Sequence, residues 1–209
     1  MKLKTLALTL GLTFNLYPAA PASADADHAL QPIVLTLFLH DQLSPQEKAS
    51  IGPDHLAWLI QELTLVTGRR VQIISVTDKP GYTDFGYRVG DPVKSLAQWH
   101  ERVGHYIDEH NLPVASRRHR YVLVTRHRLD SITLGIAYIR SDSAIASIRS
   151  YNTIGHEIGH LLGASHEAAH LSFAHGLPCG TVMSEAPLPS CYVFSDNNRQ
   201  AIRDYLKGP

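Results

Sequence analysis

The segment from Gly155 to Glu167 constrains the fold and chemistry of this chain more than any other. It reads Gly-His-Glu-Ile-Gly-His-Leu-Leu-Gly-Ala-Ser-His-Glu. His156 and His160 are four residues apart, so on a helix they project from the same face, one turn apart. Two neutral imidazoles in that arrangement can bind one metal ion. Glu157 lies beside them, where its carboxylate can act as a general base without being a ligand.

A third histidine extends the pattern. Glycine adopts the positive φ that ends a helix, so a sharp turn at Gly163 would bring His166 back to the metal. Three protein ligands with an open fourth position are typical of catalytic zinc, since a structural site uses four ligands. The alternative is a chance run of polar residues on a buried helix. With 13 histidines in 209 residues, chance produces the pattern in roughly one chain in ten thousand. We therefore predict one catalytic Zn²⁺ bound by His156, His160 and His166.

The first 24 residues have the pattern of a secretory signal peptide. A basic start precedes an apolar run over residues 6–16, and Ala22-Ser23-Ala24 supplies a small-residue cleavage site. A buried N-terminal helix or a membrane anchor is the alternative, but the run is too short to span a bilayer. We expect cleavage near Ala24 and export to the periplasm or the medium.

The remaining residues, 25–209, suit a single domain with a sizeable core. Without Lys2 and Lys4, the 19 basic residues become 17, against 19 acidic ones. The chain has no basic patch or charge run of the kind that indicates binding to nucleic acid or to an anionic membrane surface. We expect neither partner. We also expect a monomer. Cys179 and Cys191 are the only cysteines, and an exported pair should form a disulfide. Two buried thiols are the alternative.

Apolar strands and helices alternate over much of the chain. Continuous β-branched and apolar runs predict buried strands, and 3.6-residue spacing predicts helices between them. The expected strands span residues 33–39, 71–76 and 121–125, and the expected helices span 56–68, after interruptions at Pro45 and Pro53, and 96–107. This order predicts an α/β domain with a mixed, mostly parallel sheet.

Residues 133–139 predict a short fourth strand. The stretch contains a glycine and follows its neighbour after a brief turn, which favours an antiparallel edge strand. An exposed edge suits peptide binding by strand addition, because backbone hydrogen bonds hold any extended peptide. The alternative is that a loop covers this edge. The candidate substrate-binding residues are Gly135, Ile136 and Ala137.

The C-terminal part of the chain carries the metal-binding pattern, a methionine and a last predicted helix. Residues 144–151 lead into the zinc helix, which we place at residues 152–162. Met183 lies seventeen residues after His166, within Cys-Gly-Thr-Val-Met-Ser. Ser195 can cap a last helix over residues 196–206.

The pattern HExxHxxGxxH followed by a methionine resembles the signature of the metzincin zinc peptidases. The similarity is greatest to the reprolysin-like (adamalysin-like) branch, which has a similar Gly-x-Ala-Tyr edge strand and a cysteine near its Met-turn. In that branch the methionine packs beneath the three histidines, a role that falls to Met183, although an ordinary core methionine is the alternative. Glu167 departs from the branch, which usually has Asp there, and Glu185 stands where astacin-like enzymes have Tyr.

This resemblance implies an α+β zincin fold with an active-site helix, a Met-turn and a C-terminal helix. It implies a secreted endopeptidase that hydrolyses peptide or protein substrates, with Glu157 as the general base. Two other classes stay open. One is a zincin that binds peptides or a partner without cutting them, and the other is a hydrolase of a non-protein amide.

Overall fold

The computed structural model describes residues 30–114, 116–174 and 176–208. The predicted signal peptide, residues 1–24, lies outside these ranges. None of the helices in the described part of the chain combines the length and the apolar character that a membrane span requires.

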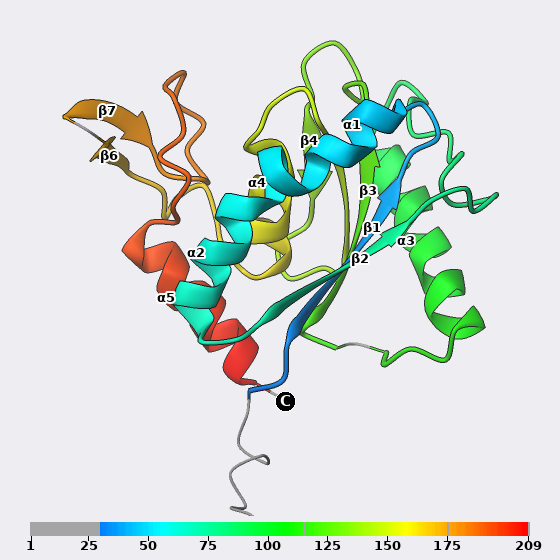
Figure 1. Cartoon of the computed structure of the whole chain (residues 1–209), viewed down its shortest axis with the longest axis horizontal. Coiled ribbons are helices and arrows are strands. Elements are labelled where there is room, and N and C mark those ends of the chain that lie inside the picture. The colour runs from blue at the N-terminus through cyan, green and yellow to red at the C-terminus, as the bar shows by residue number, and fades with distance from the viewer. Residues whose placement is uncertain (1–29, 115, 175, 209) are drawn as a thin grey trace, which may run out of the picture.

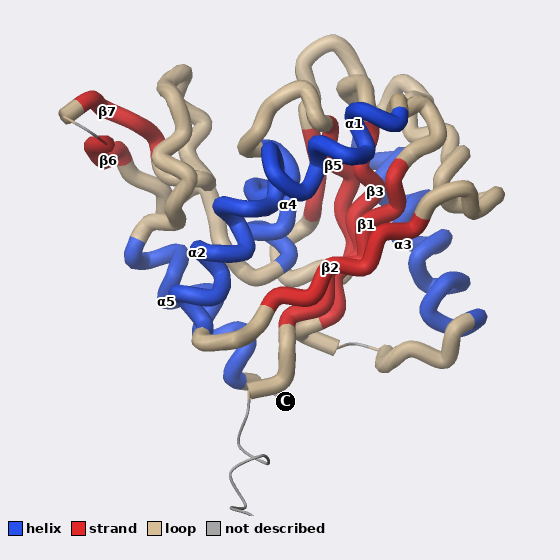
Figure 2. The backbone as a smooth tube through the Cα atoms, viewed as in Figure 1, coloured by secondary structure: helices blue, strands red, loops and turns tan. Residues whose placement is uncertain are grey.

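A five-stranded sheet forms the centre of the molecule (Figures 1 and 2). Its order is β2-β1-β3-β5-β4. The first four strands in this order are parallel to one another, and β4 pairs antiparallel with β5 at the edge. The strands are β1 (Ile33–Leu39), β2 (Val71–Val76), β3 (His119–Thr125), β4 (Gly135–Ala137) and β5 (Ser143–Ser147). The predicted fold class, a mostly parallel sheet with an antiparallel edge strand, is confirmed.

Helices cover both faces of this sheet, which is why β1 is buried at every position. Alternate β1 side chains point to opposite faces. Leu35 and Leu37 face a core shared with α2 (Ala57–Thr67), α4 (Thr153–Leu161) and α5 (Asp196–Lys207). Phe38 faces a second, more aromatic core against α3 (Pro92–Glu109), where it contacts Trp99 edge-on.

The first helical region is longer than the sequence predicts. It begins with α1 (Pro45–Ser50), continues through a π-helical turn, η2 (Ile51–Leu56), and joins α2. Pro45 sits in the first turn, where its missing N–H leaves no hydrogen bond unmade. Pro53 lies in η2, where the Ala57 N–H bonds to the Gly52 carbonyl, and this wider turn relieves the clash that proline causes in an α-helix. The predicted interruptions are therefore wrong.

Three strands escaped prediction. Residues 143–147 form β5, which inserts between β3 and β4, so β4 does not pair with the strand before it. Its sequence, Ser-Ala-Ile-Ala-Ser, is weak in strand formers, but small side chains suit a strand that α3 and α4 approach from both faces. The other two, β6 (Leu171–Ala174) and β7 (Leu177–Gly180), form a separate hairpin.

The expected disulfide joins Cys179 of β7 to Cys191. The last helix also begins where predicted, because the Ser195 side chain accepts a hydrogen bond from the Asn198 N–H. Thr153–Leu161 matches the predicted active-site helix to within one residue at each end.

Candidate metal centre

Three imidazoles converge at the carboxyl-terminal part of α4. The Nε2 atom of His166 lies 2.9 Å from Nε2 of His156 and 3.0 Å from Nε2 of His160. In the described ranges, this is the only set of three or more His, Cys, Asp or Glu side chains whose ligand atoms gather within 4.8 Å. The structure thus brings together all three histidines that the sequence pattern singles out.

The other ring nitrogens explain why the Nε2 atoms face a common point. Nδ1 of His156 lies 2.9 Å from the Val182 carbonyl, and Nδ1 of His160 lies 3.1 Å from the Ala164 carbonyl. A carbonyl only accepts, so each Nδ1 carries the proton and each Nε2 keeps its lone pair. Nδ1 of His166 lies 3.5 Å from a carboxylate oxygen of Glu185. Such outer contacts are what orient histidine ligands of metals.

Burial favours the neutral form of the helical histidines. It lowers the pKa of His156 to about 4, and it also lowers the pKa of His160. Metal binding requires neutral imidazole, so the donor set fits zinc, which takes nitrogen ligands in sites with one open position.

The turn after α4 has the hydrogen bonds of a Schellman motif. The Gly163 N–H bonds to the His160 carbonyl, and the Ala164 N–H bonds to the Gly159 carbonyl, each at 2.9 Å. Gly163 has φ +96°, which a residue with a side chain adopts only with strain. This reversal directs the chain back toward α4 and places His166 beside the helical pair.

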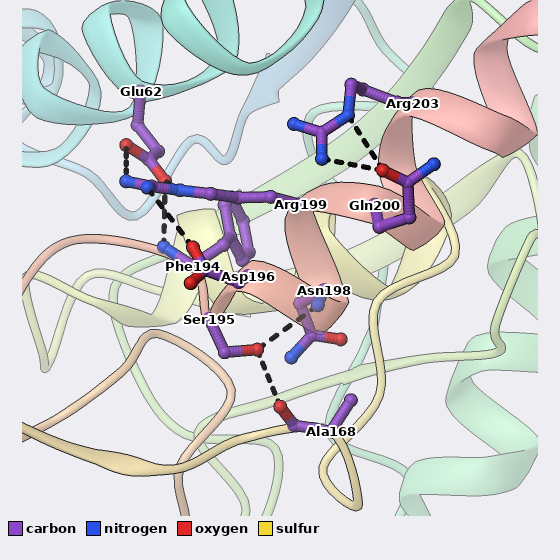
Figure 3. Close-up of polar contacts among 9 residues, drawn as sticks. All are labelled: Glu62, Ala168, Phe194, Ser195, Asp196, Asn198, Arg199, Gln200 and Arg203. Carbon is purple, nitrogen blue, oxygen red and sulfur yellow. Dashed lines mark hydrogen bonds and ion pairs between the residues drawn. The ribbon is translucent and has the colours of Figure 1, made fainter.

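The start of α5 fixes the segment that carries His166. The Asn198 side chain accepts from the Ser165 N–H at 2.8 Å and donates to the Ser165 carbonyl at 3.0 Å. The Ser195 hydroxyl, besides capping α5, donates to the Ala168 carbonyl (Figure 3). Sequence reasoning missed Asn198, whose only signal was a polar residue at the third position of a helix.

A buried carboxylate holds this end of α5 in place. Glu62 of α2 accepts from Arg199 Nε at 2.8 Å, from Arg199 Nη2 at 3.0 Å and from the Phe194 N–H at 2.9 Å (Figure 3). Breaking such a buried, hydrogen-bonded pair is costly because the remaining charge stays buried. The sequence signal for Glu62 is a carboxylate within an apolar helical run, which indicates a buried charge that needs a partner.

Met183 packs against α4, the helix that carries His156 and His160. It is fully buried, and a Cβ atom added to Gly159 would approach its Sδ atom to 2.7 Å. Glycine at position 159 is therefore needed for this close approach. The preceding residue contributes as well, because the Val182 carbonyl also accepts from the Asn152 side chain at 3.1 Å.

Glu157 lies between α4 and the edge strand β4. Its side chain is buried and packs on Gly135, where an added Cβ atom would come within 2.5 Å of the carboxylate. Burial raises the pKa of Glu157 to about 8, and a bound cation would act in the opposite direction. The glycine of the edge strand therefore makes room for this carboxylate.

A cleft of about 400 Å³ opens above these residues. Residues 133–137 line one side of it, so the edge strand borders the cleft. The rest of the lining includes the three histidines, Glu157, Ser184 and Glu185. Gly135, Ile136 and Ala137 are thus placed where an extended chain in the cleft could pair with backbone.

Comparison with known proteins gives structural likeness only. No protein-family model matches the sequence, and no curated protein matches it significantly. The structure is similar to metalloproteinase-II from Bacteroides fragilis, with a TM-score of 0.57 and 17% identity over 87% of this chain and 55% of that chain. It is also similar to archaemetzincin from Methanopyrus kandleri, with a TM-score of 0.51 and 15% identity over 85% of this chain and 97% of that chain. The chain therefore shares the zincin-like fold of these two proteins. It spans about half the length of the Bacteroides protein.

Proposed function

We propose that this zincin is a zinc-dependent endopeptidase that holds an extended peptide along β4 and hydrolyses one of its peptide bonds. The observation that carries the proposal is the convergence of three imidazole Nε2 atoms beside a buried carboxylate in an open cleft. A bound zinc ion supplies two effects: it lowers the pKa of its water to about 7 and polarises the scissile carbonyl.

The residues of the chain divide the remaining work. His156, His160 and His166 hold the ion, and their Nδ1 contacts keep the rings oriented. Glu157 accepts the proton of the attacking water and later donates it to the leaving amine. Gly135, Ile136 and Ala137 offer backbone groups that fix the substrate strand. Met183 supports the helix from below.

The setting of this activity follows from the same features. We propose a single catalytic domain over residues 25–209, exported as a monomer after removal of residues 1–24. The Cys179–Cys191 disulfide supports export, because disulfides persist in oxidising compartments. The assignment to the reprolysin-like branch is also a proposal, supported by the Gly-x-Ala-Tyr strand and the cysteine near Met183.

The test is cleavage of a mixed peptide library by the protein, by Glu157→Gln and by chelated wild type. The expected result is a set of cuts that disappears on chelation and slows by about 10²–10⁴-fold in Glu157→Gln. Glu157→Gln should still bind zinc, because the three ligands remain.

Two outcomes would contradict the proposal. Undiminished cleavage by Glu157→Gln would show that Glu157 is not the general base. A folded, zinc-loaded protein that cuts no peptide would leave a binding module or a hydrolase of a non-protein amide, and a screen of cell-wall material would separate these two.

A further inference from the structure

The β6–β7 hairpin carries large apolar side chains into solvent. Phe173 is 75% exposed, Leu177 is 70% exposed and Leu171 is 57% exposed. Figures 1 and 2 show that the hairpin stands away from the central sheet. Single exposed apolar residues are common on protein surfaces, but a cluster of them marks an interaction site.

The strand register sorts these side chains by face. Leu171 pairs with Gly180, and Phe173 pairs with Pro178. Directly opposite residues of an antiparallel pair project to the same face. Leu171, Phe173 and Pro178 therefore form one apolar face, whereas Leu177, which pairs with Ala174, projects to the opposite face.

The base of the hairpin is tied firmly to the domain. The Cys179–Cys191 disulfide holds β7, and Gly180 and Cys191 are joined by a backbone hydrogen bond of 2.8 Å. The Thr181 N–H also donates to the His170 carbonyl at 3.1 Å, which extends the pairing of the two strands by one residue. A two-stranded hairpin is marginal by itself, so these ties are what keep its apolar face presented to solvent.

The apolar face is continuous with the catalytic cleft. A second hollow, of about 290 Å³, lies between the two, and Leu171, the first residue of β6, is part of its lining. His166, Ser184 and Glu185 line both this hollow and the main cleft. A polypeptide that leaves the metal centre on this side would therefore run onto Leu171 and then toward Phe173.

The charge of the sequence around the hairpin indicates which class of ligand fits the apolar face. From Ala164 to Asn198 the sequence contains no Lys or Arg, and its charged residues are Glu167, Glu185 and Asp196. Binding to anionic lipid depends on basic residues near the surface, so a membrane fits this face poorly. An unfolded polypeptide exposes apolar side chains and can follow the hollow from cleft to hairpin.

We propose that the β6–β7 hairpin is an exosite that binds an apolar stretch of the substrate polypeptide, outside the residues that occupy the cleft. This inference rests on the proposed peptidase function. It makes the preferred substrate an extended or unfolded chain with an apolar segment at some distance from the scissile bond. The exosite raises the local concentration of that chain at the cleft.

The test compares Leu171→Ser/Phe173→Ser with wild type on three kinds of peptide that share one cleavage sequence from the library. One peptide is short, one is extended by a Leu- and Phe-rich segment, and one is extended by a Ser- and Gly-rich segment. Each extension is made at the N-terminal and, separately, at the C-terminal end. Val114→Ser, at a residue 76% exposed in the loop after α3, is the matched control variant.

Of these peptides, wild type should have the highest kcat/KM for one with the apolar extension, carried at either the N-terminal or the C-terminal end. For that peptide, the kcat/KM of the double variant should be roughly tenfold lower than that of wild type, because KM rises while kcat is unchanged. It should cleave the short and the Ser-Gly peptides as wild type does, and Val114→Ser should match wild type on all three.

Equal cleavage of the apolar peptide by wild type and the double variant would overturn the exosite. So would an equal loss on the short peptide, which would indicate damage to the cleft. Binding of the labelled apolar peptide to Glu157→Gln, with and without the hairpin changes, tests the exosite even if the protein cuts nothing. A wild-type dimer that the double variant makes monomeric, or binding to neutral lipid vesicles that it abolishes, would assign the face to a second copy or to a membrane instead.

Discussion

The three histidines of the candidate metal centre come from two parts of the chain that are stabilised in different ways. His156 and His160 lie on α4, whose apolar face is part of the main hydrophobic core through Ile154, Ile158 and Leu161. His166 lies in the next segment of the chain, which has no regular structure until β6. The helix is fixed by packing over its whole length, whereas His166 depends on a few individual contacts.

Two glycines illustrate the contrast. Gly159 is helical and leaves space for Met183 and Phe194, so its role is close packing. Gly163 has ordinary room for a Cβ atom, with its nearest neighbour 3.4 Å away, but its φ is +96°. The first is needed because of its neighbours, and the second because of its own backbone. Substitutions can separate these two requirements.

The largest stability change is expected from removing the disulfide, which joins β7 to the loop before α5. Cys179 and Cys191 are 12 residues apart, and a loop of that size corresponds to about 3 kcal/mol. Cys179→Ser/Cys191→Ser should lower the free energy of unfolding by that amount in urea titrations. It should also weaken zinc binding, because the closed loop contains Met183 and Glu185. Reduced wild type should behave like the variant, and an unchanged midpoint in both would show that the loop is held by other contacts.

The next largest change is expected at Gly159. Gly159→Ala would bring its Cβ atom to 2.7 Å from Met183 Sδ and 2.8 Å from Phe194 Cε1, and overpacking of this kind costs about 2 kcal/mol. Urea titration checks the size. Gly104→Ala is the matched control, because Gly104 is also helical, in α3, and has nothing within 4 Å of its Cβ position. That change should stabilise by about 0.5–1 kcal/mol, and equal effects at both sites would refute the packing argument.

A smaller loss of stability is expected at Gly163. Gly163→Ala should cost about 1 kcal/mol, from backbone strain rather than from collision. Zinc affinity, measured by competition with a chelator, should fall as well, since the turn sets the position of His166. Gly163→Asn should lose less on both measurements, because asparagine tolerates left-handed backbone better than alanine. If alanine were as good as glycine here, the turn would not position the ligand.

The same contrast separates what the sequence could predict from what it could not. The α4 boundaries and the three histidines follow from local spacing, as do β1, β2 and the Ser195 cap. The predicted edge strand is antiparallel, but its pairing with β5 depended on small residues that carry little strand signal. Pairing register across distant segments is not encoded by any local period.

The contacts of Glu62 and Asn198 show the other limit. Glu62 joins α2 to α5 across 137 residues, and Asn198 reaches Ser165 across 33. Each is an ordinary residue in its own helix, and its importance arises only once the helices are packed. The convergence of the three histidines was therefore predictable, whereas the residues that position His166 were not.

The smallest expected effect is on the pH dependence of the free energy of unfolding, through His156 of α4. In the chelated protein, burial lowers the pKa of His156 to about 4, below its ordinary 6.5. The folded state thus takes up a proton less readily than the unfolded state, so stability falls as pH drops below 6.5. Burial of Glu157, with a pKa of about 8, acts in the opposite direction, since its contribution is lost as pH rises.

Urea titrations of chelated wild type and His156→Gln between pH 8 and pH 6 isolate the histidine, because the Glu157 contribution is common to both. The change in the free energy of unfolding from pH 8 to pH 6 should be less favourable in wild type than in the variant, by less than about 1 kcal/mol. Parallel pH profiles would mean that α4 does not hold this ring in a buried, neutral state before metal binds. In that case the two imidazoles of α4 would become fixed only when an ion binds.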